Sequence, residues 1–159
     1  SGELNGFRAD NGGSFIIGKD LNNHQPLVDA SKNILQKAIS QIKGGVKIAD
    51  IGYLMETEAK KSGFKVIRNL AGHGVGRSLH EKPENILNYR IKSNRERFKK
   101  NTTVAIETFI ATKSTIAVEQ NDGWTLIGNK GGYVTQHEHT IMVTDGLPLI
   151  LTAANEICN

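Results

Sequence analysis

Residues 102–111 read TTVAIETFIA, a run of β-branched and apolar residues interrupted by one carboxylate. Runs of this kind predict buried strands. Four more follow in the chain: STIAVE (114–119), WTLIG (124–128), YVTQHEHTIMVT (133–144) and LPLILT (147–152). Turn signals separate them at 121–123 (NDG), 131–132 (GG) and 145–146 (DG). We therefore expect an antiparallel sheet in the second half of the chain.

Helical periodicity dominates the segment before this sheet. Apolar residues recur three and four positions apart from Leu27 to Ile42, and the glycines at 44–45 end the run. The same spacing continues from Ile48 to Ala59 and stops at Gly63. The sequence therefore predicts two helices.

Shorter strands are expected around these helices. Phe64–Arg68 is apolar and β-branched, and Gly2–Phe7 and Ser14–Ile17 read as two further strands with a turn at Ala9–Gly13. Helices followed by an antiparallel sheet predict an α+β domain.

Composition supports one globular domain. The chain has 159 residues, of which 38% are hydrophobic and 23% charged. No apolar run approaches the roughly 20 residues needed to span a bilayer, so we expect no membrane contact. Cys158 is the single cysteine, which excludes an internal disulfide, and we interpret it as a passive thiol in a cytoplasmic protein.

Basic residues concentrate in RIKSNRERFKK, Arg90–Lys100, and contribute to a formal net charge of +4. A solvated loop is the ordinary interpretation of such a run. The alternative is an RNA or ribosome contact, because clustered Lys and Arg attract phosphate. Phe98 is the only aromatic residue in the run, which disfavours base stacking, and we expect no DNA partner.

Two glutamates occupy otherwise apolar strands. Glu107 points away from the side of Ile106 and Thr108, and Glu138 shares a face with Gln136 and Thr140. His137 and His139 lie on the opposite face, which we expect to point outward. A buried carboxylate is costly unless it is paired or binds a metal, so the alternatives are an edge charge, a structural ion pair or a metal ligand.

The stretch AGHGVGRSLHEKP, residues 71–83, places His73 and His80 among three glycines. We interpret it as a turn whose glycines keep bulk away from a substrate backbone. His73, Asp10 and the two glutamates form an oxygen-rich donor set that suits Mn, Co, Zn or Fe(II). Two such ions about 3.5–4 Å apart generate a nucleophile near neutral pH, which favours hydrolysis. For His80 a structural histidine is the alternative.

Other catalytic motifs are excluded by their spacing. The glycines at 72, 74 and 76 have GxGxG spacing, and Pro83 prevents the long helix that a dinucleotide loop requires. HEKPE lacks the second histidine of HExxH, because Glu84 occupies that position. No GxSxG motif occurs in the sequence.

The motifs resemble one family, the type I methionine aminopeptidases of the pita-bread fold. The similar segments, in chain order, are FRADNGGSF, NLAGHGVGRSLHEKP, NILNY, VAIETFI, DGWT and TQHEHTIMVT. The resemblance implies an antiparallel curved sheet covered by helices, and it implies the metal ligands Asp10, His73, Glu107 and Glu138 for two divalent ions (Co, Mn, Fe or Zn).

Further roles follow from the same resemblance. His80 would hydrogen-bond the scissile carbonyl, and Glu107 would move the proton of the attacking water. Leu79 and Trp124 match the wall of the methionine pocket, and Gln136 matches a position that supports the ligands. The implied function is metal-dependent removal of N-terminal methionine from nascent proteins and peptides.

The chain departs from this family in two ways. The family has a further aspartate ligand, which by spacing falls just before Ser1, and an N-terminal half with another histidine. We therefore interpret residues 1–159 as an incomplete single catalytic domain that could itself be inactive. The family's commoner Glu-Pro is replaced by Glu107-Thr108, which we expect to be harmless.

Two alternative functions remain open. One is a related pita-bread metallopeptidase directed to Xaa-Pro bonds. The other is a non-catalytic pita-bread protein that binds peptides or RNA, although such proteins typically lose metal ligands and the four visible ligands are retained here.

Overall fold

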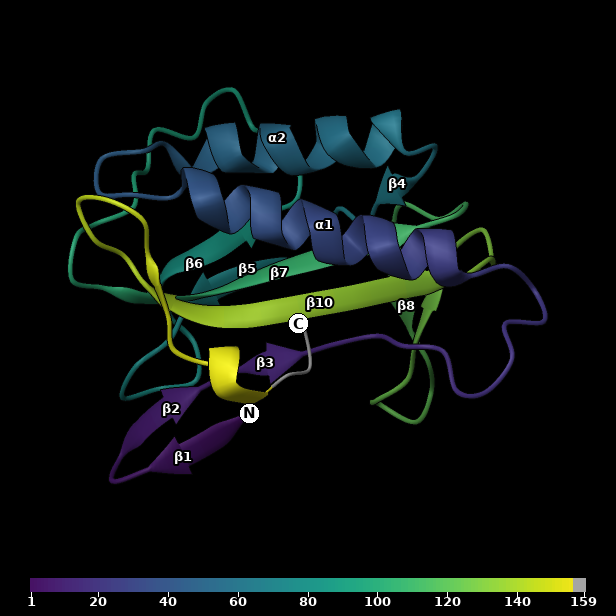
Figure 1. Cartoon of the computed structure of the whole chain (residues 1–159), viewed down its shortest axis with the longest axis horizontal. Helices are drawn as coiled ribbons and strands as arrows, with labels where there is room; N and C mark the ends of the chain where they lie inside the picture. The colour runs from purple at the N-terminus through teal and green to yellow at the C-terminus, as the bar shows by residue number, and fades with distance from the viewer. Residues whose placement is uncertain (156–159) are drawn as a thin grey trace.

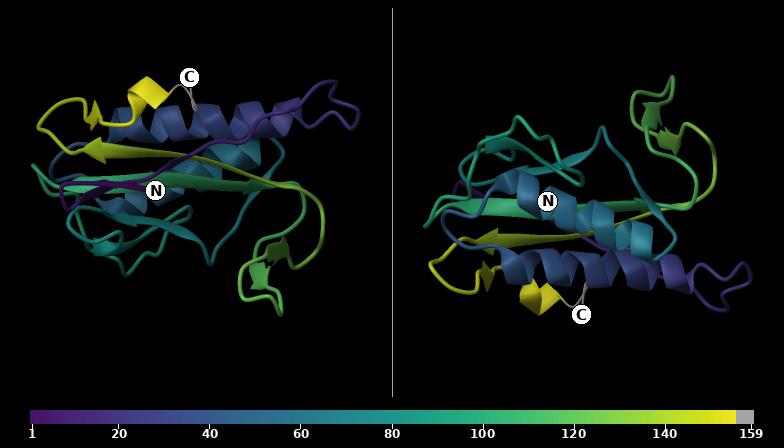
Figure 2. Two further views of the ribbon diagram at one scale, coloured as in Figure 1. Left: turned by 90° about the horizontal axis from the view of Figure 1, so that it is seen from below. Right: turned by 90° about the horizontal axis from the view of Figure 1, so that it is seen from above.

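A computed structural model describes residues 1–155; Cys158 lies outside the described residues. Two helices cover one face of a seven-stranded sheet (Figure 1). A hairpin of β1 (Gly2–Leu4) and β2 (Phe7–Ala9) lies on the other side of the sheet, and a second hairpin, β8 (Ala117–Glu119) with β9 (Leu126–Gly128), projects away from it (Figure 2). The predicted α+β class is confirmed.

Two nine-residue strands, β7 (Thr103–Ala111) and β10 (Val134–Met142), form the centre of the sheet. They pair antiparallel along their whole length, from Val134 opposite Ala111 to Met142 opposite Thr103. The order across the sheet is β11 (Leu149–Ile150), β10, β7, β5 (Ala71–Gly74) and β6 (Glu81–Leu87). Two short strands join it from the sides, β3 (Asn11–Gly12) on β10 and β4 (Lys65–Val66) on β7. The strands expected at 102–111 and 133–144 are thus confirmed.

Helix α1 (Gln25–Gln41) begins and ends as its sequence indicates. The Asp20 carboxylate accepts hydrogen bonds from the main-chain N–H groups of His24 and Gln25, and Pro26 lies in the first turn, where its missing N–H costs nothing. The helix ends before Gly45, whose positive φ of 89° reverses the chain.

Helix α2 (Ile48–Lys61) carries Asp50 in its first turn and Lys60 and Lys61 in its last, which matches the helix dipole. The apolar stripe of α1 packs on β7 and β10, whereas α2 packs against α1, β4 and β6. The core includes Leu35, Met55, Ile106 and Ile141. A short 3-10 turn, Ala153–Asn155, follows β11. No helix within residues 1–155 is long and apolar enough to cross a lipid bilayer.

Three local expectations are wrong. Ser14–Ile17 forms no strand, and the N-terminal turn lies at Asn5-Gly6, where both residues have positive φ, so residues 7–12 are largely extended. The glycine-rich stretch at 71–74 is strand β5 rather than a turn, and EKPENIL at 81–87 is a strand that the sequence did not indicate.

Candidate metal centre

Glu107 and Glu138 face each other across the centre of the sheet. They are direct partners in the β7–β10 register, and both side chains point away from α1. Glu107 is only 7% exposed and Glu138 only 3%. The antiparallel pairing therefore holds two carboxylates side by side in a poorly solvated place.

Gln136 connects these two carboxylates. Its side-chain amide nitrogen donates to Glu107 Oε2 at 3.1 Å and to Glu138 Oε2 at 3.0 Å. Gln136 precedes Glu138 by two positions on the same face of β10, so the strand itself aligns the amide with both acids. A neutral amide orients the carboxylates but does not neutralise their charge.

Burial changes the protonation equilibrium of both acids. Burial raises the pKa of Glu107 to about 7, an effect that the Asp10 charge adds to and the Gln136 hydrogen bond opposes. Burial also raises the pKa of Glu138 to about 8, and the negative charges of Glu107 and Asp10 contribute to that increase. Both shifts favour the protonated carboxyl, because burial penalises the ionised form.

His73 reaches this cluster from the neighbouring strand. It lies on β5 opposite Ala105 of β7 and is 4% exposed. Its Nδ1 is 2.9 Å from the main-chain oxygen of Gly74, and its Nε2 is 3.4 Å from Glu107 Oε1. Because a carbonyl oxygen can only accept, Nδ1 carries the proton in this contact. This contact leaves Nε2 as the ring nitrogen that faces the acids and could bind a metal.

The glycines beside His73 permit close strand packing. A Cβ on Gly72 would lie 2.4 Å from the Ala105 oxygen, and one on Gly74 would lie 2.3 Å from the Lys82 oxygen. The expectation that these glycines keep bulk away from a substrate is therefore wrong for positions 72 and 74. They let β5 approach β7 and β6 closely enough to place the imidazole between them.

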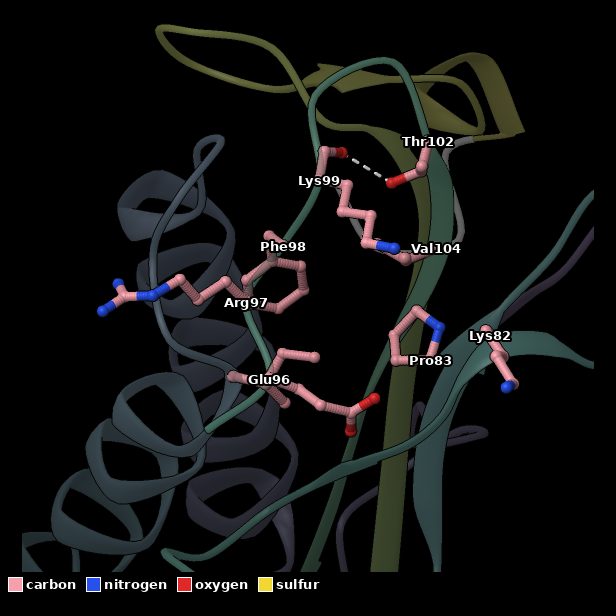
Figure 3. Close-up of a pocket in the computed structure, with 9 residues that line it drawn as sticks. Lys82, Pro83, Glu96, Arg97, Phe98, Lys99, Thr102 and Val104 are labelled. Atoms are coloured by element: carbon pink, nitrogen blue, oxygen red, sulfur yellow. Dashed lines mark hydrogen bonds between the residues drawn. The ribbon is translucent and has the colours of Figure 1, made fainter. Parts of the chain in front are cut away.

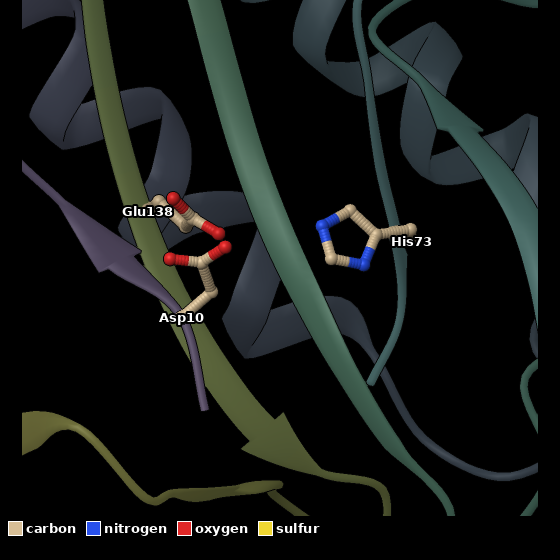
Figure 4. Close-up of side chains that lie close together, drawn as sticks. All are labelled: Asp10, His73 and Glu138. Carbon is tan, nitrogen blue, oxygen red and sulfur yellow. The ribbon is translucent and has the colours of Figure 1, made fainter. Parts of the chain in front are cut away.

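Asp10 completes the cluster from the opposite edge of β10. It precedes β3, which pairs with β10 at Gly12–Glu138 and Asn11–His139. One ligand atom from each of Asp10, His73 and Glu138 lies within 4.8 Å of the other two. Figure 4 shows the two carboxylates together, with the His73 imidazole approaching from β5. Asp10 Oδ1 is also 3.1 Å from the α-amino nitrogen of Ser1.

These donors fit a divalent cation. Buried carboxylates and a neutral imidazole nitrogen are the ligand types that Mn, Co, Zn and Fe(II) accept. Glu138 is buried close to Asp10 and His73, so a bound cation would balance a carboxylate charge that is costly to bury. The residues predicted as ligands are thus brought together, with Glu107 joined to the other three through His73 and Gln136.

The remaining predicted site residues are less tightly assembled. The His80 ring lies beside the His73 ring, with centroids 4.1 Å apart, and its side chain is exposed. Leu79 is half-buried next to it in the chain. Trp124 lies in the turn between β8 and β9 and is 88% exposed, so the structure does not bring it to the carboxylate cluster.

Two supporting residues were missed by the sequence reasoning. The Asn88 side chain donates to the Glu107 main-chain oxygen at 2.8 Å and accepts from the Phe109 N–H at 2.9 Å, so it holds the main chain of β7 directly after Glu107, on either side of Thr108. The Thr140 hydroxyl contacts the main chain of Asp10. Asn88 gave no periodic signal, whereas Thr140 shares a face with Glu138 and could have been found from that alternation.

The expectation that His137 and His139 point outward is wrong. Both are buried, because α1 covers the face of β10 on which His137 lies and Thr152 covers His139. His137 Nδ1 lies 3.0 Å from the hydroxyl of Ser31, which in turn lies 2.8 Å from the hydroxyl of Thr108. Burial lowers the pKa of each of these histidines, so both favour the neutral form.

The fold and the cluster define the class of protein, a helix-covered antiparallel sheet with a candidate metal centre on its other face. Residues 1–145 match metallopeptidase family M24. The chain belongs to that family.

Individual relatives agree with this assignment. The chain is 42% identical over 152 residues to methionine aminopeptidase 2 of Bacillus subtilis, covering 96% of this chain and 61% of the relative. A methionine aminopeptidase structure from Thermotoga maritima has a TM-score of 0.87 at 34% identity, covering 93% of this chain and 59% of that one. This likeness confirms the predicted pita-bread architecture. The chain spans about three fifths of the length of these relatives.

A third comparison supports the fold alone. An X-Pro aminopeptidase structure from Thermotoga maritima has a TM-score of 0.68 at 18% identity, covering 92% of this chain and 36% of that one.

Proposed function

We propose that the protein removes N-terminal methionine from polypeptides by metal-dependent hydrolysis. The observation that carries the proposal is the convergence of Asp10, His73 and Glu138 within 4.8 Å, with Glu107 alongside. The relatives named methionine aminopeptidases, at 33–42% identity, support methionine as the residue removed. The likeness to the X-Pro aminopeptidase concerns the fold only, so it does not favour proline-directed cleavage.

Asp10, His73, Glu107 and Glu138 would hold two divalent ions. Such ions supply Lewis acidity and lower the pKa of a water molecule. Retention of all four side chains also disfavours a non-catalytic binding protein, because that role does not require buried carboxylates in a costly environment.

The chain's own residues would orient the substrate and move the proton. Glu107, buried beside His73 and Glu138, would accept a proton from the attacking water and return it to the leaving amine. His80 stands exposed beside His73 and would donate a hydrogen bond to the scissile carbonyl, stabilising the negative charge that develops there. Leu79, half-buried and next to His80 in the chain, would contact the methionine side chain.

The proposal is tested with full-length protein, metal analysis and peptide hydrolysis. We expect bound divalent metal, cleavage of Met-Ala-Ser, and no cleavage of Xaa-Pro peptides. Glu107→Gln should lose activity by at least a hundredfold, whereas Glu119→Gln, an exposed change on the β8–β9 hairpin, should leave it unchanged. Full turnover by the Glu107 variant would contradict the role of Glu107, and preference for Xaa-Pro peptides would contradict the substrate.

We also propose that the substrate is met as a nascent chain in the cytoplasm, with the basic segment 90–100 touching ribosomal RNA. Phe98 is buried against the start of α2, where a cavity of about 240 Å³ separates this segment from β6 (Figure 3), so the surrounding charges project from an anchored backbone. Arg90 pairs with Asp50, Lys100 pairs with Asp145, and Arg97 donates to the main-chain oxygen of Gly45. The exposed candidates for phosphate contact are therefore Lys92, Arg95 and Lys99.

The ribosome contact is tested by co-sedimentation. Charge reversal of Arg95 and Lys99 should weaken binding and its salt dependence, whereas reversal of Lys60 and Lys61 on α2 should not. Equal binding by both variants would remove the contact from the proposal.

A further inference from the structure

Thr140 binds both polar groups of the Asp10 main chain. Its hydroxyl accepts a hydrogen bond from the Asp10 N–H at 2.8 Å and donates one to the Asp10 carbonyl oxygen at 2.7 Å. Thr140 is 1% exposed and follows Glu138 by two positions on β10. The two bonds therefore tie Asp10 to the strand that carries Glu138.

Ordinary strand pairing cannot hold Asp10 in this place. Strand β3 has two residues, paired with β10 at positions 138 and 139, and the next pair in the register would be Asp10 with Thr140. The main chain of Thr140 is already committed elsewhere. Its N–H donates to the Thr152 hydroxyl at 3.2 Å, and its carbonyl accepts from the Leu151 N–H at 2.9 Å.

β10 thus changes partner on this edge at Thr140. Before it the partner is β3, and after it the partner is β11, which pairs at Ile141 and Met142. The main chain of Thr140 bonds residues 151 and 152 and is therefore not available to Asp10. The side-chain hydroxyl of Thr140 makes the two hydrogen bonds to the Asp10 main chain instead. The stiff, β-branched side chain holds the hydroxyl in one rotamer, which suits this substitution.

We propose that Thr140 is a positioning residue that sets the metal affinity of the site by fixing Asp10, and that the turn at Leu151–Thr152 acts on the site through it. Thr152 also lies 2.8 Å from His139 Nδ1, so its hydroxyl joins two consecutive residues of β10 just beyond Glu138. The inference rests on the proposed function only in requiring that the cluster bind a divalent cation. It does not depend on which peptide is cleaved.

The test compares threonine variants by their affinity for Mn²⁺, measured by electron paramagnetic resonance or calorimetry, and by their metal-free unfolding. Thr140→Val should weaken Mn²⁺ binding about tenfold or more, as loss of outer contacts to ligands does elsewhere. Thr140→Ser keeps the hydroxyl and should restore most of the affinity. Thr152→Val should give a smaller loss, because Thr152 contacts Thr140 rather than Asp10.

Thr135→Val is the matched control. Thr135 is also buried on β10, but its hydroxyl bonds the Leu27 carbonyl under α1, on the face opposite the acids. It should lose stability without losing Mn²⁺ affinity. The proposal is overturned if Thr140→Val binds Mn²⁺ within twofold of the wild type, or if Thr135→Val loses as much affinity. If Thr140→Val does not fold, unchanged affinity in Thr152→Val overturns the role of the turn, and a tenfold loss in Thr140→Ser overturns the role of the hydroxyl. If the Mn²⁺ affinities of the variants follow the expected order but the protein does not cleave Met-Ala-Ser, the proposed function is refuted and the role of Thr140 is retained.

Discussion

Glu138→Gln should stabilise the metal-free protein at high pH while abolishing its stabilisation by metal. Burial and two neighbouring negative charges raise the pKa of Glu138 from 4.5 to about 8 in the folded protein. A carboxyl group with a raised folded pKa binds its proton more tightly in the folded state. Its contribution to stability is therefore complete below pH 4.5 and is lost as the pH rises through 8.

The size of the effect follows from the shift. One pKa unit corresponds to about 1.4 kcal/mol, so a shift from 4.5 to about 8 makes ionised Glu138 cost on the order of 3–5 kcal/mol above pH 8. Glutamine has nearly the same shape and no charge to bury. We expect metal-free Glu138→Gln to exceed the wild type by about 3 kcal/mol in free energy of unfolding at pH 9.

Urea unfolding in the presence of a chelator at pH 5, 7 and 9 measures this difference. At pH 5 the wild-type carboxyl is protonated and the two proteins should unfold alike. Adding Mn²⁺ at pH 7 should reverse the order, because only the wild type retains the ligand. Exposed Glu119→Gln should follow the wild type throughout. A stability gap that does not grow with pH would refute the electrostatic account of the cluster.

Three structural substitutions extend the test, each measured by chemical unfolding against a control. Gly74→Ala places a Cβ 2.3 Å from the Lys82 oxygen and should lose about 3 kcal/mol, whereas Gly146→Ala, with nothing within 4 Å, should be nearly neutral. Asn88→Ala leaves the Glu107 carbonyl and the Phe109 N–H without their partner and should lose about 2 kcal/mol, unlike Asn85→Ala on the exposed side of β6. Ser31→Ala removes the hydroxyl between His137 and Thr108 and should lower the free energy of unfolding by about 1–3 kcal/mol, whereas Ser40→Ala, an exposed change on the same helix, should not. For each of the three pairs, an equal loss in the variant and in its control would contradict the contact described.

The helices and central strands were predictable because each has a strong period. The apolar residues of α1 and α2 recur at helical spacing, and β7 and β10 are long β-branched runs. Alternation along those runs also placed Glu107 on the face opposite Ile106 and Thr108, and Glu138 on the face of Gln136 and Thr140. That part of the site is encoded locally.

Strands β5 and β6 were not predictable on the same grounds. The glycines of β5 have low strand propensity, and they are needed because the main chains of β7 and β6 approach within a distance that admits no side chain. Strand β6 includes Pro83 and three charged residues, which resemble a loop when read alone. Both strands form because they pair with neighbouring strands, and the spacing of residues within 71–87 carries no information about that pairing.

The two faces of β10 show a second limit of sequence patterns. Alternation correctly assigned Gln136 and Glu138 to one face and His137 and His139 to the other, but both faces proved to be covered. Both faces of β10 carry polar side chains between positions 136 and 139, so hydrophobicity alone does not decide which residues of this strand face α1. The hydrogen bonds choose it: Ser31 and Thr108 are placed for His137 under α1, and Gln136 is placed for the two acids. A slip of one residue would exchange the faces and place Gln136 and Glu138 beneath α1, away from Asp10 and His73, so the network around His137 indirectly keeps Glu138 at the metal centre.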